Sequence, residues 1–187
     1  MASTKVDLVV SLKIPDNEAR SALEALRVKM GLADVVAGLE RDDVWELTVD
    51  ASDEADATEL VGGLVTGTNL FANPNKHRTA VGSPGATGAP LREDEVAVLV
   101  AERGSTEGSS ILRTLQGLDV QNVTDARRWT RWRIRLAETP REGDASVVSL
   151  VRRVAVATGR DEGLLSNPHS EVSRVVLPWG EEAWLEE

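Results

Sequence analysis

The chain reads Leu70-Phe-Ala-Asn-Pro74 and later Leu164-Leu-Ser-Asn-Pro168, so nearly the same five residues occur once in each half. Asparagine favours turns, and proline cannot donate a backbone hydrogen bond. An Asn-Pro pair therefore marks the point where a helix must end before an edge strand. Its recurrence indicates that a small domain has been duplicated along the chain.

The elements expected around the first Asn-Pro pair follow from hydrophobic periodicity and capping signals. In order they are a strand at 5–12, a helix from 15 to 31, strands at 35–39 and 44–49, a helix beginning at 52, and a strand near 78–81. Arg41-Asp42-Asp43 is interpreted as the polar turn of a hairpin between the two middle strands. Ser52-Asp53-Glu54 is expected to cap the second helix.

The same order recurs around the second pair. We expect a strand at 95–101, a weaker helix at 109–116, strands near 120–127 and 129–136, a helix at 144–157 and a strand at 172–177. The valine-rich run 147–156 has strand composition, but its apolar residues keep helical spacing. Register with the first half favours the helix.

Residues 82–92 are rich in glycine, proline and alanine, which resist regular structure, and predict a linker. The resulting organisation is a first repeat at 1–81, the linker 82–92, a second repeat at 93–178 and an acidic, tryptophan-containing tail at 179–187. The order predicts an α+β fold of two β-α-β-β-α-β units, each a sheet with both helices on one face. We expect the two units to pack as a pseudo-dimer, which leaves further dimerisation open.

Composition excludes several classes of function. The net charge of −10 is shared equally, with 9 basic and 14 acidic residues in 1–92 against 12 and 17 in 93–187. An acidic chain lacks the basic surface that binds phosphate backbones, which argues against nucleic-acid and membrane-surface partners. The chain has no cysteine and no long apolar segment, and a cytoplasmic protein is expected.

No catalytic motif occurs in the sequence: there is no nucleophile elbow, phosphate-binding loop or His-Glu-x-x-His. His77 and His169 follow the two Asn-Pro pairs, but neither has metal-ligand neighbours at a suitable spacing, and ordinary surface histidines are the simpler interpretation. We expect no catalytic residue, no metal ligand and no cofactor bound by this chain.

The candidate site residues belong to a partner interface. Asn73, Pro74, Asn167 and Pro168 form either partner-binding loop tips or structural turns. Arg131, Arg133 and Arg135 share a strand face opposite Trp132, Ile134 and Leu136. They present either a stripe that binds phosphate or an acidic partner, or a solvated or interface face neutralised by nearby Asp and Glu. Trp45 and Trp132 occupy corresponding strand positions in the core, whereas Trp179 and Trp184 are candidate interface anchors.

Three segments of the first repeat resemble PurS, the small subunit of phosphoribosylformylglycinamidine (FGAM) synthase. They are Lys5-Val-Asp-Leu-Val-Val-Ser-Leu-Lys13, Val44-Trp-Glu-Leu-Thr-Val49 and Leu70-Phe-Ala-Asn-Pro74. The second repeat resembles it more faintly, through Trp132-Arg-Ile-Arg-Leu136 and Leu164-Leu-Ser-Asn-Pro168. In place of the family's acidic and aromatic continuation after Asn-Pro, this chain has Asn75-Lys-His-Arg78 and His169-Ser-Glu-Val172.

The resemblance implies a non-catalytic assembly subunit of de novo purine biosynthesis, with two PurS-like copies fused in one chain. It would bridge a glutaminase and an ATP-dependent synthetase, and ATP and Mg²⁺ would belong to the synthetase partner. Two other classes stay open from the residues alone: a small-molecule-sensing or scaffold module, and an enzyme of the dimeric α+β barrel type. The last would need a polar catalytic cluster that the sequence does not offer.

Overall fold

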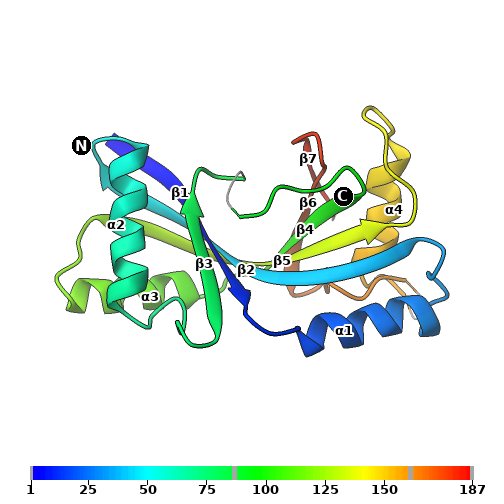
Figure 1. Cartoon of the computed structure of the whole chain (residues 1–187), viewed down its shortest axis with the longest axis horizontal. Coiled ribbons are helices and arrows are strands. Elements are labelled where there is room, and N and C mark those ends of the chain that lie inside the picture. The colour runs from blue at the N-terminus through cyan, green and yellow to red at the C-terminus, as the bar shows by residue number, and fades with distance from the viewer. Residues whose placement is uncertain (1, 86–87, 160–161, 186–187) are drawn as a thin grey trace. The chain divides into compact units, whose positions relative to one another are not determined.

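The computed structural model describes residues 2–85, 88–159 and 162–185, and it has an α+β fold (Figure 1). The elements are β1 (Ala2–Leu12), α1 (Asn17–Glu24) with the π-helical turn η1 (Ala25–Lys29), β2 (Val36–Ala51), α2 (Glu54–Gly67), β3 (His77–Gly82), β4 (Glu95–Glu102), α3 (Glu107–Gly117), β5 (Val123–Leu136), α4 (Ser146–Ala155), β6 (Glu171–Val176) and β7 (Glu182–Trp184). The strands form one antiparallel sheet in the order β3-β1-β2-β5-β4-β6-β7.

The chain divides into two compact units that interleave along the sequence. The first unit contains Met1–Ile14, Asp42–Pro90 and Gly104–Trp129, and the second contains Pro15–Arg41, Leu91–Arg103 and Thr130–Glu187. Helix α1 therefore belongs to the second unit and α3 to the first, while β2 and β5 each contribute to both. The repeats proposed at 1–81 and 93–178 are stretches of sequence, and each compact unit takes segments from both.

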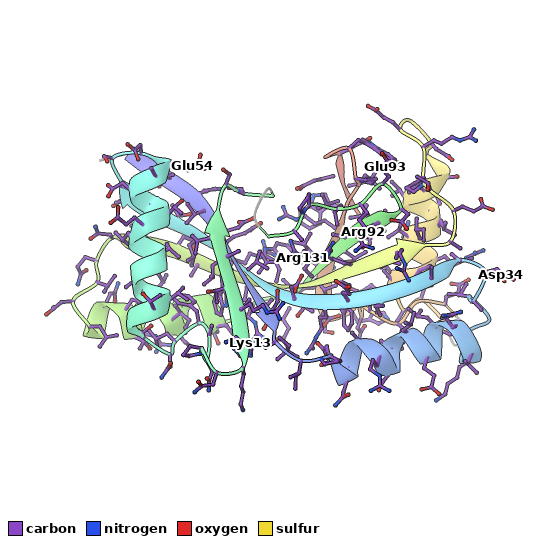
Figure 2. All side chains as sticks on the ribbon, viewed as in Figure 1. Lys13, Asp34, Glu54, Arg92, Glu93 and Arg131 are labelled. Atoms are coloured by element: carbon purple, nitrogen blue, oxygen red, sulfur yellow. The ribbon has the colours of Figure 1, made fainter. Side chains whose placement is uncertain are left out.

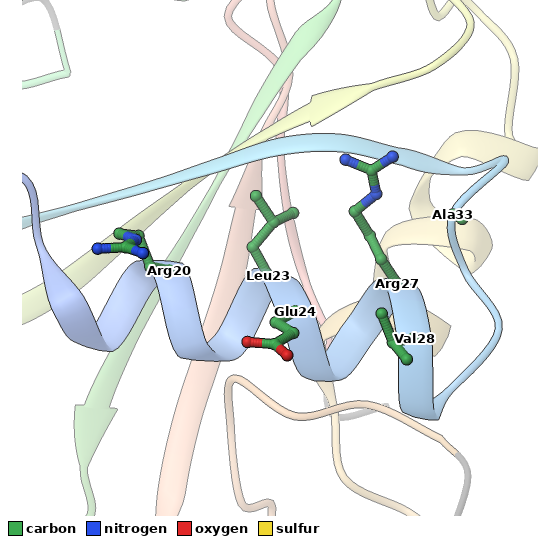
Figure 3. Close-up of a pocket in the computed structure, with 6 residues that line it drawn as sticks. All are labelled: Arg20, Leu23, Glu24, Arg27, Val28 and Ala33. Carbon is green, nitrogen blue, oxygen red and sulfur yellow. The ribbon is translucent and has the colours of Figure 1, made fainter.

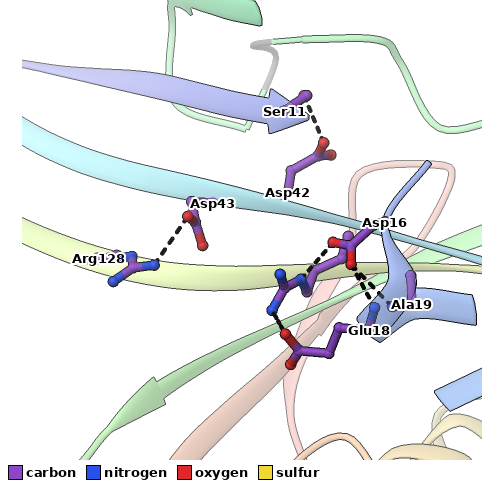
Figure 4. Close-up of polar contacts among 8 residues, drawn as sticks. Ser11, Asp16, Glu18, Ala19, Asp42, Asp43 and Arg128 are labelled. Carbon is purple, nitrogen blue, oxygen red and sulfur yellow. Dashed lines mark hydrogen bonds and ion pairs between the residues drawn. The ribbon is translucent and has the colours of Figure 1, made fainter. Parts of the chain in front are cut away.

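The hairpin expected at Arg41-Asp42-Asp43 is wrong, because β2 runs through these residues as one continuous strand (Figure 4). Arg41 forms ion pairs with Asp16 and Glu18, and the Ser11 hydroxyl donates to Asp42 at 2.6 Å. The guanidinium of Arg128 lies 3.0 Å from the Asp43 carboxylate. Arg41, Asp42 and Asp43 thus each have a hydrogen-bond or ion-pair partner. For this reason a polar triplet with the composition of a turn is accommodated within a strand.

The break expected between strands 120–127 and 129–136 is also wrong, since β5 is continuous from Val123 to Leu136. Arg128 pairs with Glu107 as well as with Asp43, and the Arg127 guanidinium stacks 4.0 Å from the Trp129 ring centre. Arg128 is therefore held by a carboxylate of β2 and one of α3, and Arg127 by the aromatic ring of Trp129 on its own strand. Each half of the sequence has the order strand, helix, long strand, helix, strand, in place of the six elements expected, and the second half adds the short strand β7.

The core of the first unit lies between one face of its sheet and two helices. Strand β1 contributes Val6, Leu8 and Val10, and these pack in one cluster with buried residues of α2 and with Leu115 of α3. The cap of α2 lies in Ser52-Asp53-Glu54, as expected, and the capping residue is Asp53, whose side chain accepts from the Asp56 backbone N–H. Both helices cover the same face, but α3 comes from the other half of the sequence.

The core of the second unit has the corresponding composition. Helices α1 and α4 pack on the strand face that carries Val98, Trp132 and Ile134. The valine-rich run is helical, as predicted, and its Val147, Val151 and Val154 are buried. The α1 helix begins at Asp16, whose carboxylate accepts from the backbone N–H groups of Glu18 and Ala19 (Figure 4).

Candidate functional site

The first Asn-Pro pair forms a tight, exposed turn that is closed by its own hydrogen bonds. The Asn73 side-chain oxygen accepts from the Asn75 N–H at 2.9 Å, and the Asn73 carbonyl accepts from the N–H groups of Lys76 and His77. The Asn73 N–H in turn donates to Nδ1 of His77 at 3.0 Å. The His77 ring therefore contributes to the structure of the turn.

The second Asn-Pro pair repeats this pattern bond for bond. The Asn167 side-chain oxygen accepts from the His169 N–H at 3.1 Å, and its carbonyl accepts from the N–H groups of Ser170 and Glu171. The Asn167 N–H donates to the Glu171 carboxylate at 2.6 Å, in the place that the His77 ring takes in the first turn. The two turns share a backbone structure and differ in side-chain charge.

Each turn is held against a neighbouring strand by one basic residue. The Lys13 backbone N–H donates to the Lys76 carbonyl at 2.9 Å, and its Nζ donates to the Pro74 carbonyl at 2.6 Å. Arg103 makes the same two contacts in the other half, to the Ser170 and Pro168 carbonyls. Sequence reasoning missed this pair, although each is the first basic residue after the strand that opens its half.

The strands beside the turns also share their register. Leu8 of β1 lies between Trp45 of β2 and Val81 of β3. In the other half, Val98 of β4 lies between Trp132 of β5 and Val175 of β6. Trp45 and Trp132 therefore occupy corresponding positions, as predicted, and each is only 6% exposed.

The arginine stripe of β5 lies opposite the core face, as the alternation predicts, and Figure 2 labels Arg131 on this strand. Arg133 is largely neutralised by Glu95 at 2.6 Å and Glu40 at 3.6 Å. Arg135 is exposed and donates to the Ala37 carbonyl at 3.4 Å. Arg133 is therefore paired with carboxylates of its own chain, which favours the interpretation of a neutralised face over that of a binding stripe for an acidic partner.

Glu95 is a buried carboxylate on this face. Burial acts to raise its pKa, and this is the largest single effect, but hydrogen bonds from the Arg92 N–H and the Arg133 guanidinium oppose it. Together with the charges of both arginines, these bonds hold the Glu95 pKa below its ordinary value. The carboxylate is therefore ionised at neutral pH and serves as the counter-ion of Arg133.

The two tryptophans of the C-terminal segment have different surroundings. Trp179 packs against the core of the second unit and donates from Nε1 to Glu181 at 2.9 Å. Trp184 lies in β7 and is 51% exposed, while the next residue, Leu185, is buried at 1% exposure. The segment expected as a tail at 179–187 thus includes a strand of the sheet, and Trp184 is its exposed aromatic side chain.

Outside the turns, a shallow hollow of about 460 Å³ lies beside α1 (Figure 3). Its lining combines Arg20 and Arg27 with Leu23, Glu24, Val28 and Ala33. Among the described residues, no group of three or more His, Asp or Glu side chains is arranged to hold a metal ion. No helix in the described part of the chain has the length and apolar character needed to cross a membrane.

Comparisons of the chain with protein-family models, curated proteins and solved structures found no match.

Proposed function

We propose that the chain is a non-catalytic assembly subunit of FGAM synthase, in which it bridges the glutaminase and the ATP-dependent synthetase. One observation carries the proposal. The Asn-Pro turn that takes part in the resemblance to PurS occurs twice, with the same internal hydrogen bonds, the same basic anchor and the same strand register. A chain with two equivalent exposed turns suits a bridging role. The repetition of the turn also supports the proposal that two PurS-like copies are fused in this chain.

The proposed mechanism is positional. A glutaminase and a synthetase that exchange ammonia need their active sites held in a constant relation, because proximity and orientation replace a diffusive encounter. The chain would supply binding surfaces only, and ATP and Mg²⁺ would bind to the synthetase. Its own contribution is rigidity: each turn is closed on both sides by hydrogen bonds and tied to a strand through Lys13 or Arg103.

Reconstitution tests the proposal directly. Purified synthetase and glutaminase are assayed for glutamine-dependent, ATP-consuming FGAM formation with and without this chain. We expect product only when the chain is present, and equal activity in its absence would end the proposal. Ammonia as nitrogen donor provides an internal control, because it bypasses the transfer step and should support the synthetase alone.

Variants locate the function on the turns. Asn73→Ala and Asn167→Ala each remove the side-chain acceptor that closes one turn and should lower glutamine-dependent activity without affecting the ammonia-dependent reaction. The matched control is Asn122→Ala, which changes an exposed asparagine just before β5 and keeps the backbone carbonyl that accepts from the Asp50 N–H. If both turn variants matched the Asn122 control, the turns would not be the partner-binding elements.

A second candidate function, small-molecule sensing, is favoured by the hollow beside α1. Its volume falls in the range of ligand sites, and its two arginines suit a carboxylate or phosphate. Thermal-shift screening against amino acids and nucleotides separates the candidates. A stabilising ligand whose effect is lost in Arg27→Ala, in a chain that binds neither enzyme, would favour sensing.

A further inference from the structure

In the second unit, the outer edge of β6 is covered by the short strand β7, and Figure 1 shows the two strands together. Arg174, Val175 and Val176 pair antiparallel with Trp184, Ala183 and Glu182. The Leu185 N–H donates to the Ser173 carbonyl at 3.0 Å, and the Leu177 N–H donates to the Glu181 carbonyl at 2.8 Å. The chain's own segment thus shows what kind of strand this edge accepts: short and acidic, with exposed Trp184 and buried Leu185.

Strand β3 of the first unit is the counterpart of β6, because it pairs with β1 in the register that β6 has with β4. Within residues 2–85, 88–159 and 162–185, β1 is its one neighbour in the sheet, and nothing equivalent to β7 covers its outer edge. An uncovered edge strand presents a row of backbone donors and acceptors to a further strand.

Register shows which groups of β3 face outward. The Lys76 carbonyl accepts from the Lys13 N–H, so the alternation of an antiparallel ladder points the backbone groups of Arg78 and Ala80 towards β1. Those of Thr79 and Val81 then point away from β1. Thr79 lies opposite Val10 on β1, and Ser173 lies opposite Val100 on β4 in the same register. The outward carbonyl of Thr79 therefore corresponds to the Ser173 carbonyl, which accepts from the Leu185 N–H on β6.

The charge is positive at the end of this edge where β3 begins, in an otherwise acidic chain, whereas at the other end Ser83 donates to the Glu54 carboxylate. Lys13, Lys76 and Arg78 are exposed, and Figure 2 labels Lys13 at the end of β1. Within the described residues, neither Lys76 nor Arg78 forms an ion pair. The corresponding turn on β6 carries Ser170 and Glu171 in place of Lys76 and His77. The two equivalent edges therefore differ in occupancy and in charge.

We infer that the outer edge of β3 binds a short acidic strand of a partner protein, which pairs antiparallel as β7 pairs on β6. Strand addition of this kind draws affinity from backbone hydrogen bonds and selectivity from alternate side chains. A second copy of this chain is a poorer occupant, because its β7 would have to leave β6 to reach β3. The inference does not depend on the enzyme complex proposed above.

A labelled peptide tests the inference. The probe is Glu-Ala-Trp-Leu-Glu-Glu, the sequence of residues 182–187. If its leucine pairs beside Thr79, as Leu185 pairs beside Ser173, its last two glutamates reach Arg78 and His77. A second peptide replaces these last two glutamates with lysine. Fluorescence anisotropy should show saturable binding of the acidic peptide, with a Kd on the order of 100 μM, and binding at least about tenfold weaker for the lysine peptide. No binding of the acidic peptide at millimolar concentration would overturn the inference.

Variants of Thr79 place the peptide on the outward groups of β3. Thr79→Pro removes an outward N–H while leaving the ladder to β1 intact, and it should weaken binding by about tenfold or more. Thr79→Ala, which changes the side chain alone, should bind as the parent chain does. Equal binding by Thr79→Pro would place the peptide elsewhere, for example on β6 after displacement of β7, and would refute the inference.

The peptide itself provides a test that does not depend on the folding of Thr79→Pro. Methylation of the leucine backbone nitrogen removes the donor that Leu185 uses on Ser173. It should weaken binding to the unmodified chain to a similar extent, and bound acidic peptide should slow hydrogen exchange of the Thr79 and Val81 amides. Unchanged affinity after methylation would contradict strand pairing.

Discussion

Helix α3 approaches the sheet of the first unit very closely at Gly108, and replacing this residue by alanine gives the sharpest test of the packing. A Cβ atom on Gly108 would lie 1.8 Å from the Ala126 carbonyl oxygen of β5. Non-bonded carbon and oxygen atoms approach to roughly 3.3 Å, so the start of α3 would have to move by about 1.5 Å. Overpacking of this kind costs about 1–3 kcal/mol.

Alanine also favours helix over glycine, by about 1 kcal/mol, which offsets part of that cost. Gly63→Ala in α2 is the matched control, because nothing lies within 4 Å of a Cβ at that position. We expect Gly63→Ala to be neutral or stabilising by up to about 1 kcal/mol. The difference in unfolding free energy between the two variants should then be about 1–3 kcal/mol, the overpacking cost alone.

Urea unfolding followed by tryptophan fluorescence and circular dichroism measures this difference. A chain of this length shifts its Tm by roughly 2–4 °C for each kcal/mol, so thermal melts give a second estimate. If Gly108→Ala were as stable as Gly63→Ala, α3 would not lie against β5 as described. The assignment of α3 to the first unit would then fail with it.

Three further predictions concern polar contacts. Asp16→Ala removes the cap of α1 and the partner of Arg41 and should lower the unfolding free energy by about 1–2 kcal/mol. Asp16→Asn keeps a side-chain acceptor and should lower the unfolding free energy by less. Urea titrations that rank the two variants in the reverse order would contradict this. Because the folded pKa of Glu95 is lowered, its contribution is complete above the ordinary glutamate pKa and disappears as pH falls through the lowered one. The stability difference between the parent chain and Glu95→Gln should therefore shrink below about pH 4, and a difference that grew on acidification would refute this. Lys13→Met removes the side-chain contact to the Pro74 carbonyl and should speed amide exchange in the first turn by about two- to fivefold, while exchange in the second turn stays unchanged.

Alternation and helical spacing in the sequence were sufficient to predict most elements. The α+β class, the strands β1, β3, β4 and β6 and the helical nature of the valine-rich run follow from apolar residues that repeat every two or about 3.6 positions. The opposition of Arg133 to Trp132 and Ile134 on β5 follows from the same local rule. The Asn-Pro turns could be located for a similar reason, since the turn preference of asparagine and the missing proline N–H act within a few residues.

Local sequence signals gave the wrong structure where the side chains concerned contact residues far away in the chain. Arg41-Asp42-Asp43 resembles a turn until Asp16, Ser11 and Arg128 are seen to contact the three side chains. Arg128 suggests the end of a strand when only its sequence neighbours are considered, but its ion pairs with Glu107 and Asp43 accommodate it within β5. The anchors Lys13 and Arg103 were missed for the same reason, because their contacts join residues more than sixty positions apart.

The amino-acid sequence by itself determined where the helices and most strand segments lie, where the Asn-Pro turns occur and which strand faces are apolar, because these depend on neighbours a few residues apart. It did not show that β2 and β5 are continuous or that Glu182–Trp184 forms β7. Only the tertiary structure decided that α1 and α3 each pack with segments of the other half, and that β6 is covered by β7 while β3, among the residues described, has an open edge. Periodicity marks a helix face as buried without stating which sheet buries it. An edge strand and a paired strand have the same side-chain alternation, because hydrogen-bonded neighbours are chosen by backbone groups that every residue except proline shares.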